Sequence, residues 1–192
     1  MRDISPEDRQ RRLRLRVAAK LMLFMAVATA AYVLLSSISG RQDQASRLPT
    51  LRVPVGDLQP GQVNIVEWEG RPVIFYRRSA GDLATLRRDD ARLLDPVSDS
   101  SEQPDFFDRI ERSATPELFV AIALGTDLGC PVAYLPAADT AFQGKPWSGG
   151  FVDTCRQARY DLAGRVYRHQ YADRNLLVPP YSVDEDTVTL GR

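Results

Sequence analysis

The stretches GTDLGC, at residues 125–130, and DTCRQARYD, at residues 153–161, decide how the rest of this sequence is interpreted. Each stretch carries one cysteine, and Cys130 and Cys155 are the only two cysteines in the chain. Thiolate is the only ligand type in either stretch that suits a soft metal centre. The two stretches therefore raise the question whether they form a metal site or what remains of one.

The composition is that of a globular domain with an appended segment. The chain has 192 residues, 44% of them hydrophobic, and its 25 basic residues balance its 25 acidic ones. This length allows one ordinary domain and a short extension. A net charge of zero argues against nucleic acid as a partner, because binding to phosphates would require a basic excess.

The N-terminal part of the sequence has the pattern of a membrane anchor. Residues 21–38 (LMLFMAVATAAYVLLSSI) carry no charge, and with the residues just before them they reach the roughly 20 apolar residues that a membrane-spanning helix needs. We therefore expect a basic N-terminus at residues 1–16, a transmembrane helix at residues 17–39 and a polar tether at residues 40–50.

The charges that flank this helix predict its orientation. Seven basic residues precede residue 21, against three acidic ones, so the positive-inside rule places residues 1–16 in the cytoplasm and residues 51–192 outside. In a bacterium the chain would be a single-pass protein of the inner membrane with a periplasmic domain. The alternatives are a buried core helix and a cleaved signal peptide, whose apolar region is usually shorter, at about 7 to 15 residues.

Residues 51–192 are rich in short segments of β-branched and aromatic residues. Residues 63–79 divide at Glu69-Gly70 into two such segments, which predicts a β-hairpin, and residues 82–94 have the spacing of a short helix capped by Asp82. Further strands are expected at residues 51–55, 118–125, 149–155, 165–169, 175–183 and 186–191. Many short strands separated by turn residues predict a mainly β domain, either a sandwich or a small barrel.

Four segments of this domain resemble one known family. They are GDLQPGQVNIVEWEGRPVIFYRR, GTDLGCP, FVDTCRQARYDLAGRV and NLLVPPYSVDEDTVTLG. In this order they resemble the Rieske iron-sulfur subunit of cytochrome bc complexes, in which the first loop reads C-T-H-x-G-C and the second reads C-P-C-H-G-S-x-Y-D. The resemblance covers the anchor and nearly all of residues 51–192, and it implies a Rieske-like antiparallel β-sandwich. The chain keeps the family residues Thr126, Leu128, Gly129, Cys130, Cys155, Tyr160, Asp161, Gly164 and Arg165.

The departures from the family pattern fall on the positions that hold its metal cluster. A Rieske 2Fe-2S cluster is held by two thiolates and two imidazoles. The resemblance places Gly125, Asp127, Asp153 and Arg156 at the four ligand positions. Glycine has no side chain, arginine is a permanent cation and aspartate is a hard oxygen ligand, so none of the four suits an iron-sulfide cluster. We therefore expect no 2Fe-2S cluster and no other metal.

The two remaining cysteines match the family's non-ligand pair. The resemblance, together with an oxidising compartment, implies a disulfide between Cys130 and Cys155. The alternative is a redox-active dithiol, which the wide spacing of the two residues disfavours. Asp127, Asp153 and Arg156 would converge where the family has its cluster, and we expect an aspartate-arginine pair to hold the two loops together.

His169 and the pair Asp127 and Asp153 are two further candidate sites. His169 is the only histidine and lies where the family has a loop that covers the cluster, in the stretch HQYAD. Without a second metal-binding neighbour it is expected to be a polar surface residue. Asp127 and Asp153 could also form a carboxylate pair for calcium or for hydrolysis, but the sequence nearby offers no further ligands.

These features predict a non-catalytic role. We expect a cluster-less accessory subunit of a respiratory membrane complex, namely a cytochrome bc complex, a terminal oxidase or their supercomplex. The implied partners are the membrane and subunits such as cytochrome b, cytochrome c or oxidase subunits, and Leu128 at the tip of the first loop is the expected contact. The alternatives are a periplasmic thiol/disulfide redox protein and a tethered binding module.

Overall fold

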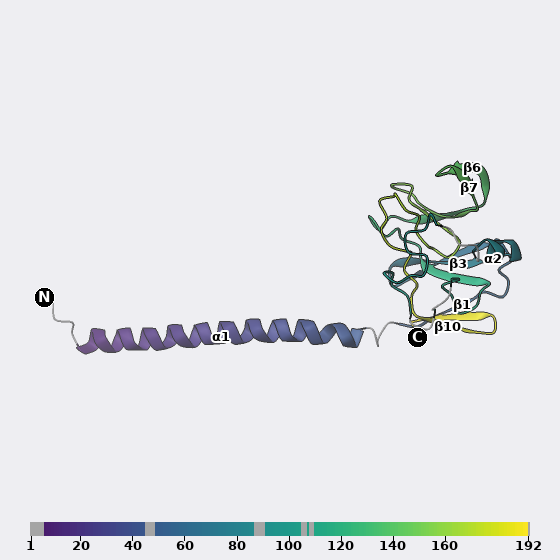
Figure 1. Ribbon diagram of the computed structural model, residues 1–192. Helices are drawn as coiled ribbons and strands as arrows, with labels where there is room; N and C mark the ends of the chain where they lie inside the picture. The colour runs from purple at the N-terminus through teal and green to yellow at the C-terminus, as the bar shows by residue number, and fades with distance from the viewer. Residues whose placement is uncertain (1–5, 45–48, 87–90, 105–106, 108–109, 192) are drawn as a thin grey trace. The chain divides into compact units, whose positions relative to one another are not determined.

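The computed structural model describes residues 6–44, 49–86, 91–104, 107 and 110–191. The chain divides into two compact units, one that ends at Leu48 and one that begins at Pro49. The first unit contains a single long helix and the second contains small sheets (Figure 1).

Helix α1 (Pro6–Gln44) contains the whole predicted transmembrane segment. Proline is favoured at the first position of a helix, because that position needs no hydrogen-bonded N–H. By length and composition, the stretch Arg9–Ser36 is apolar and long enough to cross a membrane. The helix continues to Gln44, so residues 40–44 of the predicted tether are helical. No proline follows until Pro49, and the polar residues after Gly40 tolerate a helix.

The second unit is mainly β, as predicted, and every strand pair in it is antiparallel. One sheet has the order β1-β11-β10, a second β2-β3-β4 and a third β5-β8-β9, while β6 and β7 form a hairpin. The strands are β1 (Leu51–Pro54), β2 (Val63–Trp68), β3 (Arg71–Arg77), β4 (Leu118–Ile122), β5 (Val132–Leu135), β6 (Ala138–Phe142), β7 (Lys145–Trp147), β8 (Gly150–Asp153), β9 (Arg159–Tyr160), β10 (Tyr181–Asp184) and β11 (Thr187–Leu190).

The predicted hairpin at residues 63–79 is present as β2 and β3. Trp68 pairs with Arg71, so the loop consists of Glu69 and Gly70, both with positive φ (56° and 68°). Two residues with positive φ are what a type I′ turn requires. β3 and β4 are almost completely buried along their lengths and form the centre of the core.

The predicted helix at residues 82–94 is wrong at both ends. Helix α2 (Ala80–Leu86) starts earlier and is capped by Ser79, whose Oγ accepts a hydrogen bond from the Asp82 N–H (3.2 Å), while an Asp82 carboxylate oxygen accepts one from the Ser79 N–H (2.7 Å). This is a capping box, in which Asp82 is the third helical residue and not the cap. Residues 91–94 form a turn and a bridge, and residues 87–90 lie outside the described residues.

Two of the predicted strands are much shorter than expected. Residues 165–169 contribute only isolated bridges, and the strand expected at residues 175–183 begins at Tyr181. Pro179 and Pro180 have no N–H to donate to a neighbouring strand, which explains the late start of β10.

Two buried arginines join the loops of this unit to one another. Arg78 and Arg112 are 2% and 1% exposed, and burial lowers the pKa of both guanidinium groups to about 10, so both stay charged at neutral pH. Each donates several hydrogen bonds of 2.7–3.3 Å, mostly to backbone carbonyl oxygens far away in the sequence. The acceptors of Arg112 are the side chain of Gln103 and the carbonyl oxygens of Ala163, Gly164 and Leu176.

We expect Arg112→Met to lower the free energy of unfolding by more than about 3 kcal/mol, because the carbonyl groups of Ala163 and Leu176 lose the hydrogen bonds that Arg112 donates to them. Chemical denaturation of the full chain in detergent measures the effect. The control is Arg52→Met at an exposed position of β1, which should change stability by less than about 0.5 kcal/mol. Equal effects for the two variants would contradict the role given to Arg112.

Candidate functional site

A disulfide joins the two loops that the sequence singled out. The first loop follows β4 and leads into β5, and the second connects β8 and β9. Cys130 of the first loop is bonded to Cys155 of the second, with 6.1 Å between their Cα atoms, which confirms the predicted pairing. Thr154 adds two hydrogen bonds to the carbonyl oxygen of Pro131, from its N–H (3.1 Å) and its Oγ1 (2.9 Å). The two loops are therefore held as one body.

Asp153 and Gly125 fit together at the base of these loops. Asp153 ends β8 with 1% of its surface exposed, and its Oδ1 accepts hydrogen bonds from the N–H groups of Cys155 (2.7 Å) and Arg156 (2.9 Å). Its other oxygen, Oδ2, lies directly against Gly125, so that a Cβ built on Gly125 would overlap it. Two of the expected ligand positions are thus complementary: Gly125 has no side chain at the place where Asp153 puts its carboxylate.

Arg156 of the second loop links the first loop to the HQYAD stretch. Its Nη1 lies 3.1 Å from Asp127 Oδ2, so the expected aspartate-arginine pair between the loops is present. That oxygen is shielded from solvent but makes no hydrogen bond of acceptable geometry, which makes the contact an ion pair without an aligned hydrogen bond. The guanidinium also lies over the ring of Tyr171, 4.5 Å from its centroid. Arg156 therefore contacts the first loop and the HQYAD stretch from its place in the second loop.

Tyr160 and Thr126 form a hydrogen-bonded link behind the tip. The Tyr160 hydroxyl accepts a hydrogen bond from the Thr126 N–H (3.0 Å) and lies 3.1 Å from Thr126 Oγ1. Because Thr126 Oγ1 donates its proton to the carbonyl oxygen of Arg174 (2.7 Å), the Tyr160 hydroxyl is the donor to Thr126 Oγ1. Burial raises the pKa of Tyr160, so this donor remains protonated at neutral pH.

The family residues after the second loop have structural contacts of their own. Asp161 Oδ1 accepts hydrogen bonds from the N–H groups of Ala163 (2.9 Å) and Arg165 (2.8 Å), and Asp161 Oδ2 forms a buried ion pair with Arg165 (2.7 Å). Gly164 has a φ of 67° and lies against the Phe119 ring, where an added Cβ would be 2.8 Å from Cζ. These residues stabilise the turn whether or not a cluster is bound.

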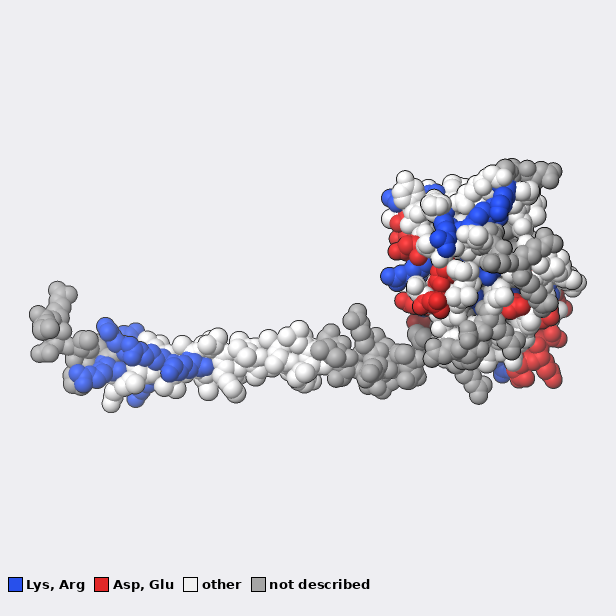
Figure 2. Space-filling view, in the orientation of Figure 1, with Lys and Arg blue, Asp and Glu red and all other residues white. Residues whose placement is uncertain are grey.

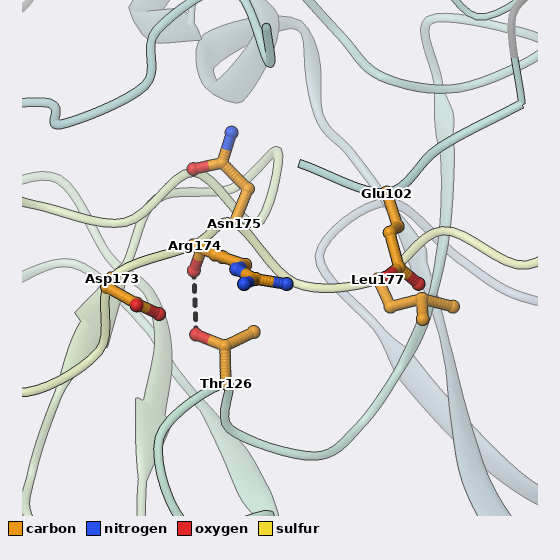
Figure 3. Close-up of a pocket in the computed structure, with 6 residues that line it drawn as sticks. All are labelled: Glu102, Thr126, Asp173, Arg174, Asn175 and Leu177. Atoms are coloured by element: carbon orange, nitrogen blue, oxygen red, sulfur yellow. Dashed lines mark hydrogen bonds between the residues drawn. The ribbon is translucent and has the colours of Figure 1, made fainter. Parts of the chain in front are cut away.

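The sequence did not predict the pocket beside Thr126, which has a volume of about 360 Å³ (Figure 3). It is lined by Glu102, Thr126, Asp173, Arg174, Asn175 and Leu177. Its walls come from three separate segments, so no local motif marks it. The charges on its rim are mixed, which indicates no single class of ligand.

His169 is exposed and has a φ of 60°, as a polar surface residue in a turn would. Among the described residues, Cys130, Asp153 and Cys155 are the group whose ligand atoms lie close enough for a metal, within 4.8 Å of one another. Both sulfurs of this group are already bonded to each other.

The residues present do not fit a 2Fe-2S cluster of the Rieske type. That cluster requires two thiolates and two imidazoles, whereas the chain has two cysteines, joined in a disulfide, and one histidine. The positions expected to correspond to ligands bear a carboxylate packed on a glycine and a guanidinium paired with a carboxylate. This donor set offers no soft ligand for iron.

We expect Gly125→Ala to destabilise the full chain by about 2 kcal/mol, because its methyl group overlaps the Asp153 carboxylate. Asp153→Ala removes the overlapping carboxylate and leaves only the Cβ at position 153, 3.4 Å from the added methyl group, so the cost of adding Gly125→Ala should fall by at least about 1 kcal/mol. A double-mutant cycle of denaturant unfolding measures this coupling. Additive effects would show that the two residues do not interact.

We expect Arg156→Gln to change the free energy of unfolding by less than about 1 kcal/mol, because Arg156 is 42% exposed and solvent screens its ion pair. Amide hydrogen exchange at Leu128 and Gly129 should nevertheless become faster, since the first loop loses one of its contacts with the second, the Asp127–Arg156 ion pair. Unchanged exchange rates in both loops would contradict the bridging role. Arg52→Gln, at an exposed position of β1 outside both loops, is the control.

Comparison with known proteins identifies the relatives of this chain. It is 39% identical over 136 residues to the ubiquinol-cytochrome c reductase iron-sulfur subunit of Allochromatium vinosum, which is 71% of this chain and 66% of that protein. It is 32% identical over 160 residues to the cytochrome b-c1 complex subunit Rieske-1 of Arabidopsis thaliana, which is 82% of this chain and 51% of that protein. The chain thus spans about half to two-thirds of these relatives. No protein-family model matches it.

Among solved structures, a chain of a hyperthermophilic respiratory Complex III matches 90% of this chain and 98% of its own length, with 16% identity and a TM-score of 0.44. The ferredoxin of carbazole 1,9a-dioxygenase from Nocardioides aromaticivorans matches 73% of this chain and 95% of its own length, with 9% identity and a TM-score of 0.37. TM-scores this low do not support membership of a family. The family membership of this chain rests on the similarity of its sequence to those of its relatives and on the disulfide-linked loops. The chain belongs to the family of Rieske iron-sulfur subunits of ubiquinol-cytochrome c reductase.

Proposed function

We propose that this chain is a membrane-anchored Rieske-type subunit that works without a cluster, as an accessory or structural part of a respiratory membrane complex. The complex would be a cytochrome bc complex, a terminal oxidase or their supercomplex. The observation that carries the proposal is the Cys130–Cys155 disulfide, because it uses both cysteines of the chain and leaves no thiolate for iron.

The chemistry of the tip supports a role other than electron transfer. An electron carrier of the Rieske type needs thiolate and imidazole ligands at its tip. Here Gly125, Asp127, Asp153 and Arg156 would stand at the ligand positions, where Gly125 packs against Asp153 and Asp127 forms an ion pair with Arg156. These contacts fix the loops in place, as a scaffold for protein-protein contact requires. In this proposal the chain is a non-catalytic subunit of an oxidoreductase.

The helix α1 supports membrane attachment. Its apolar stretch has the length of a single span, and the relatives are named as subunits of ubiquinol-cytochrome c reductase and of the cytochrome b-c1 complex. By the positive-inside rule, residues 1–16 would lie in the cytoplasm and the domain at residues 51–192 in the periplasm of a bacterium. An oxidising periplasm is also the compartment in which a structural disulfide persists.

Leu128 is the proposed contact with a partner subunit. It lies at the tip of the first loop with 59% of its surface exposed, next to Gly129 with its positive φ of 69°. A leucine held outward on a loop fixed by a disulfide loses little conformational entropy on binding. Cytochrome b, cytochrome c or oxidase subunits are the partners that the family membership favours.

Purification of the tagged full chain in mild detergent, followed by mass spectrometry and an iron assay, tests the proposal. We expect haem-containing respiratory subunits in the preparation, with all iron accounted for by those subunits. Leu128→Asp should reduce their recovery at least about fivefold, because binding would bury the new charge. Val97→Asp, at an apolar position that is 62% exposed in another loop, should leave recovery unchanged and serves as the matched control.

A lone, iron-free protein would contradict the accessory role and favour a tethered binding module. Recovery of a partner through a mixed disulfide would instead favour the thiol/disulfide redox protein. Equal losses for Leu128→Asp and Val97→Asp would contradict the contact proposed for the tip.

A further inference from the structure

The N-terminal turns of α1 carry a high density of positive charge. Residues 9–36 include no acidic residue, and their basic side chains are exposed and gather at the N-terminal end of the helix (Figure 2). They are Arg9, Arg11, Arg12, Arg14, Arg16 and Lys20. The positive-inside rule explains why such residues lie on one side of a membrane, but it does not depend on their arrangement around the helix.

The arrangement is uneven. With about 100° of rotation per residue, Arg9, Arg12, Arg16 and Lys20 fall within about 80° of one another around the helix axis. We call these four residues the cationic row. Arg11 and Arg14 lie on the opposite side of the helix. Each neighbouring pair of the row is three or four residues apart, so the side chains follow one another along one face.

The row lies directly beside the apolar stretch. At about 1.5 Å per residue, α1 is roughly 58 Å long, whereas the hydrocarbon core of a bilayer is about 30 Å thick. The uncharged stretch begins at Leu21, immediately after Lys20, so the row starts at the N-terminal edge of that stretch and runs about 16 Å outward. Lys20 and Arg16 would then lie near the depth of the phospholipid phosphates, and Arg12 and Arg9 continue the row outward along the same face.

We propose that the cationic row binds the headgroups of anionic phospholipids. A row of guanidinium groups matches phosphate both in charge and in its capacity for paired hydrogen bonds. Basic residues next to a membrane surface are attracted to anionic lipid by about a kcal/mol each, and four on one face add their contributions at one place. The inference rests on the proposed membrane attachment, and it adds a lipid-binding face that attachment alone does not require.

Native mass spectrometry of the full chain tests the proposal, after transfer from nanodiscs of equal parts phosphatidylcholine and phosphatidylglycerol into mild detergent. We expect the protein to retain phosphatidylglycerol in preference to phosphatidylcholine. Arg12→Gln/Arg16→Gln should lower the retained phosphatidylglycerol about tenfold. Arg11→Gln/Arg14→Gln removes the same charge from the same turns but from the opposite face, and should change retention less than twofold.

An equal loss of retained phosphatidylglycerol in the two double variants would overturn the proposal. The total charge of the helix end, and not the cationic row, would then attract the lipid. Absence of any preference in the unaltered protein would overturn it as well. Extraction of membranes with alkaline carbonate separates these results from a failure of the proposed function. A chain that remains in the membrane but retains no anionic lipid refutes the row alone, whereas a chain released by carbonate refutes the anchor itself.

Discussion

The two disulfide-linked loops depend on the contacts that the carboxylate of Asp153 makes with both of them. It is buried, it accepts two backbone hydrogen bonds from the second loop and it occupies the space beside Gly125 of the first loop. Aspartate is well suited to this place, because its short side chain can accept hydrogen bonds from N–H groups two and three residues ahead. The disulfide and the Asp127–Arg156 ion pair lie on the outer side of the same loops and keep them closed around this carboxylate.

In the proposed cluster-less subunit, contacts between side chains hold the two loops together. These contacts act in pairs, since Gly125 packs against Asp153 and Asp127 forms an ion pair with Arg156. The surrounding turn is stabilised independently, by the Tyr160–Thr126 hydrogen bonds and by the buried Asp161–Arg165 ion pair. The turn after the second loop therefore has contacts of its own, separate from those between the proposed ligand positions.

Much of this structure could be predicted from the sequence where local chemistry decides. The hairpin at Glu69-Gly70, the disulfide implied by the family resemblance and the pairing of Arg156 with an aspartate are confirmed. Ser79 followed three residues later by Asp82 has the pattern of a capping box, and the prediction that Asp82 is the cap is wrong. The fit between Gly125 and Asp153 could not be predicted, because it depends on the distance between two loops that only the folded sheets determine. The same holds for the pocket beside Thr126, whose walls come from distant segments.

Electron paramagnetic resonance of the purified full chain tests directly whether it can hold a 2Fe-2S cluster. The sample is incubated anaerobically with ferrous iron and sulfide and then reduced with dithionite, beside a cluster-carrying Rieske subunit treated in the same way. We expect the signal of a reduced 2Fe-2S cluster in the control and no such signal in this chain. The cysteines of this chain are bonded to each other, and its other candidate positions offer no soft ligand. A Rieske-type signal from this chain, in proportion to its protein content, would contradict the account.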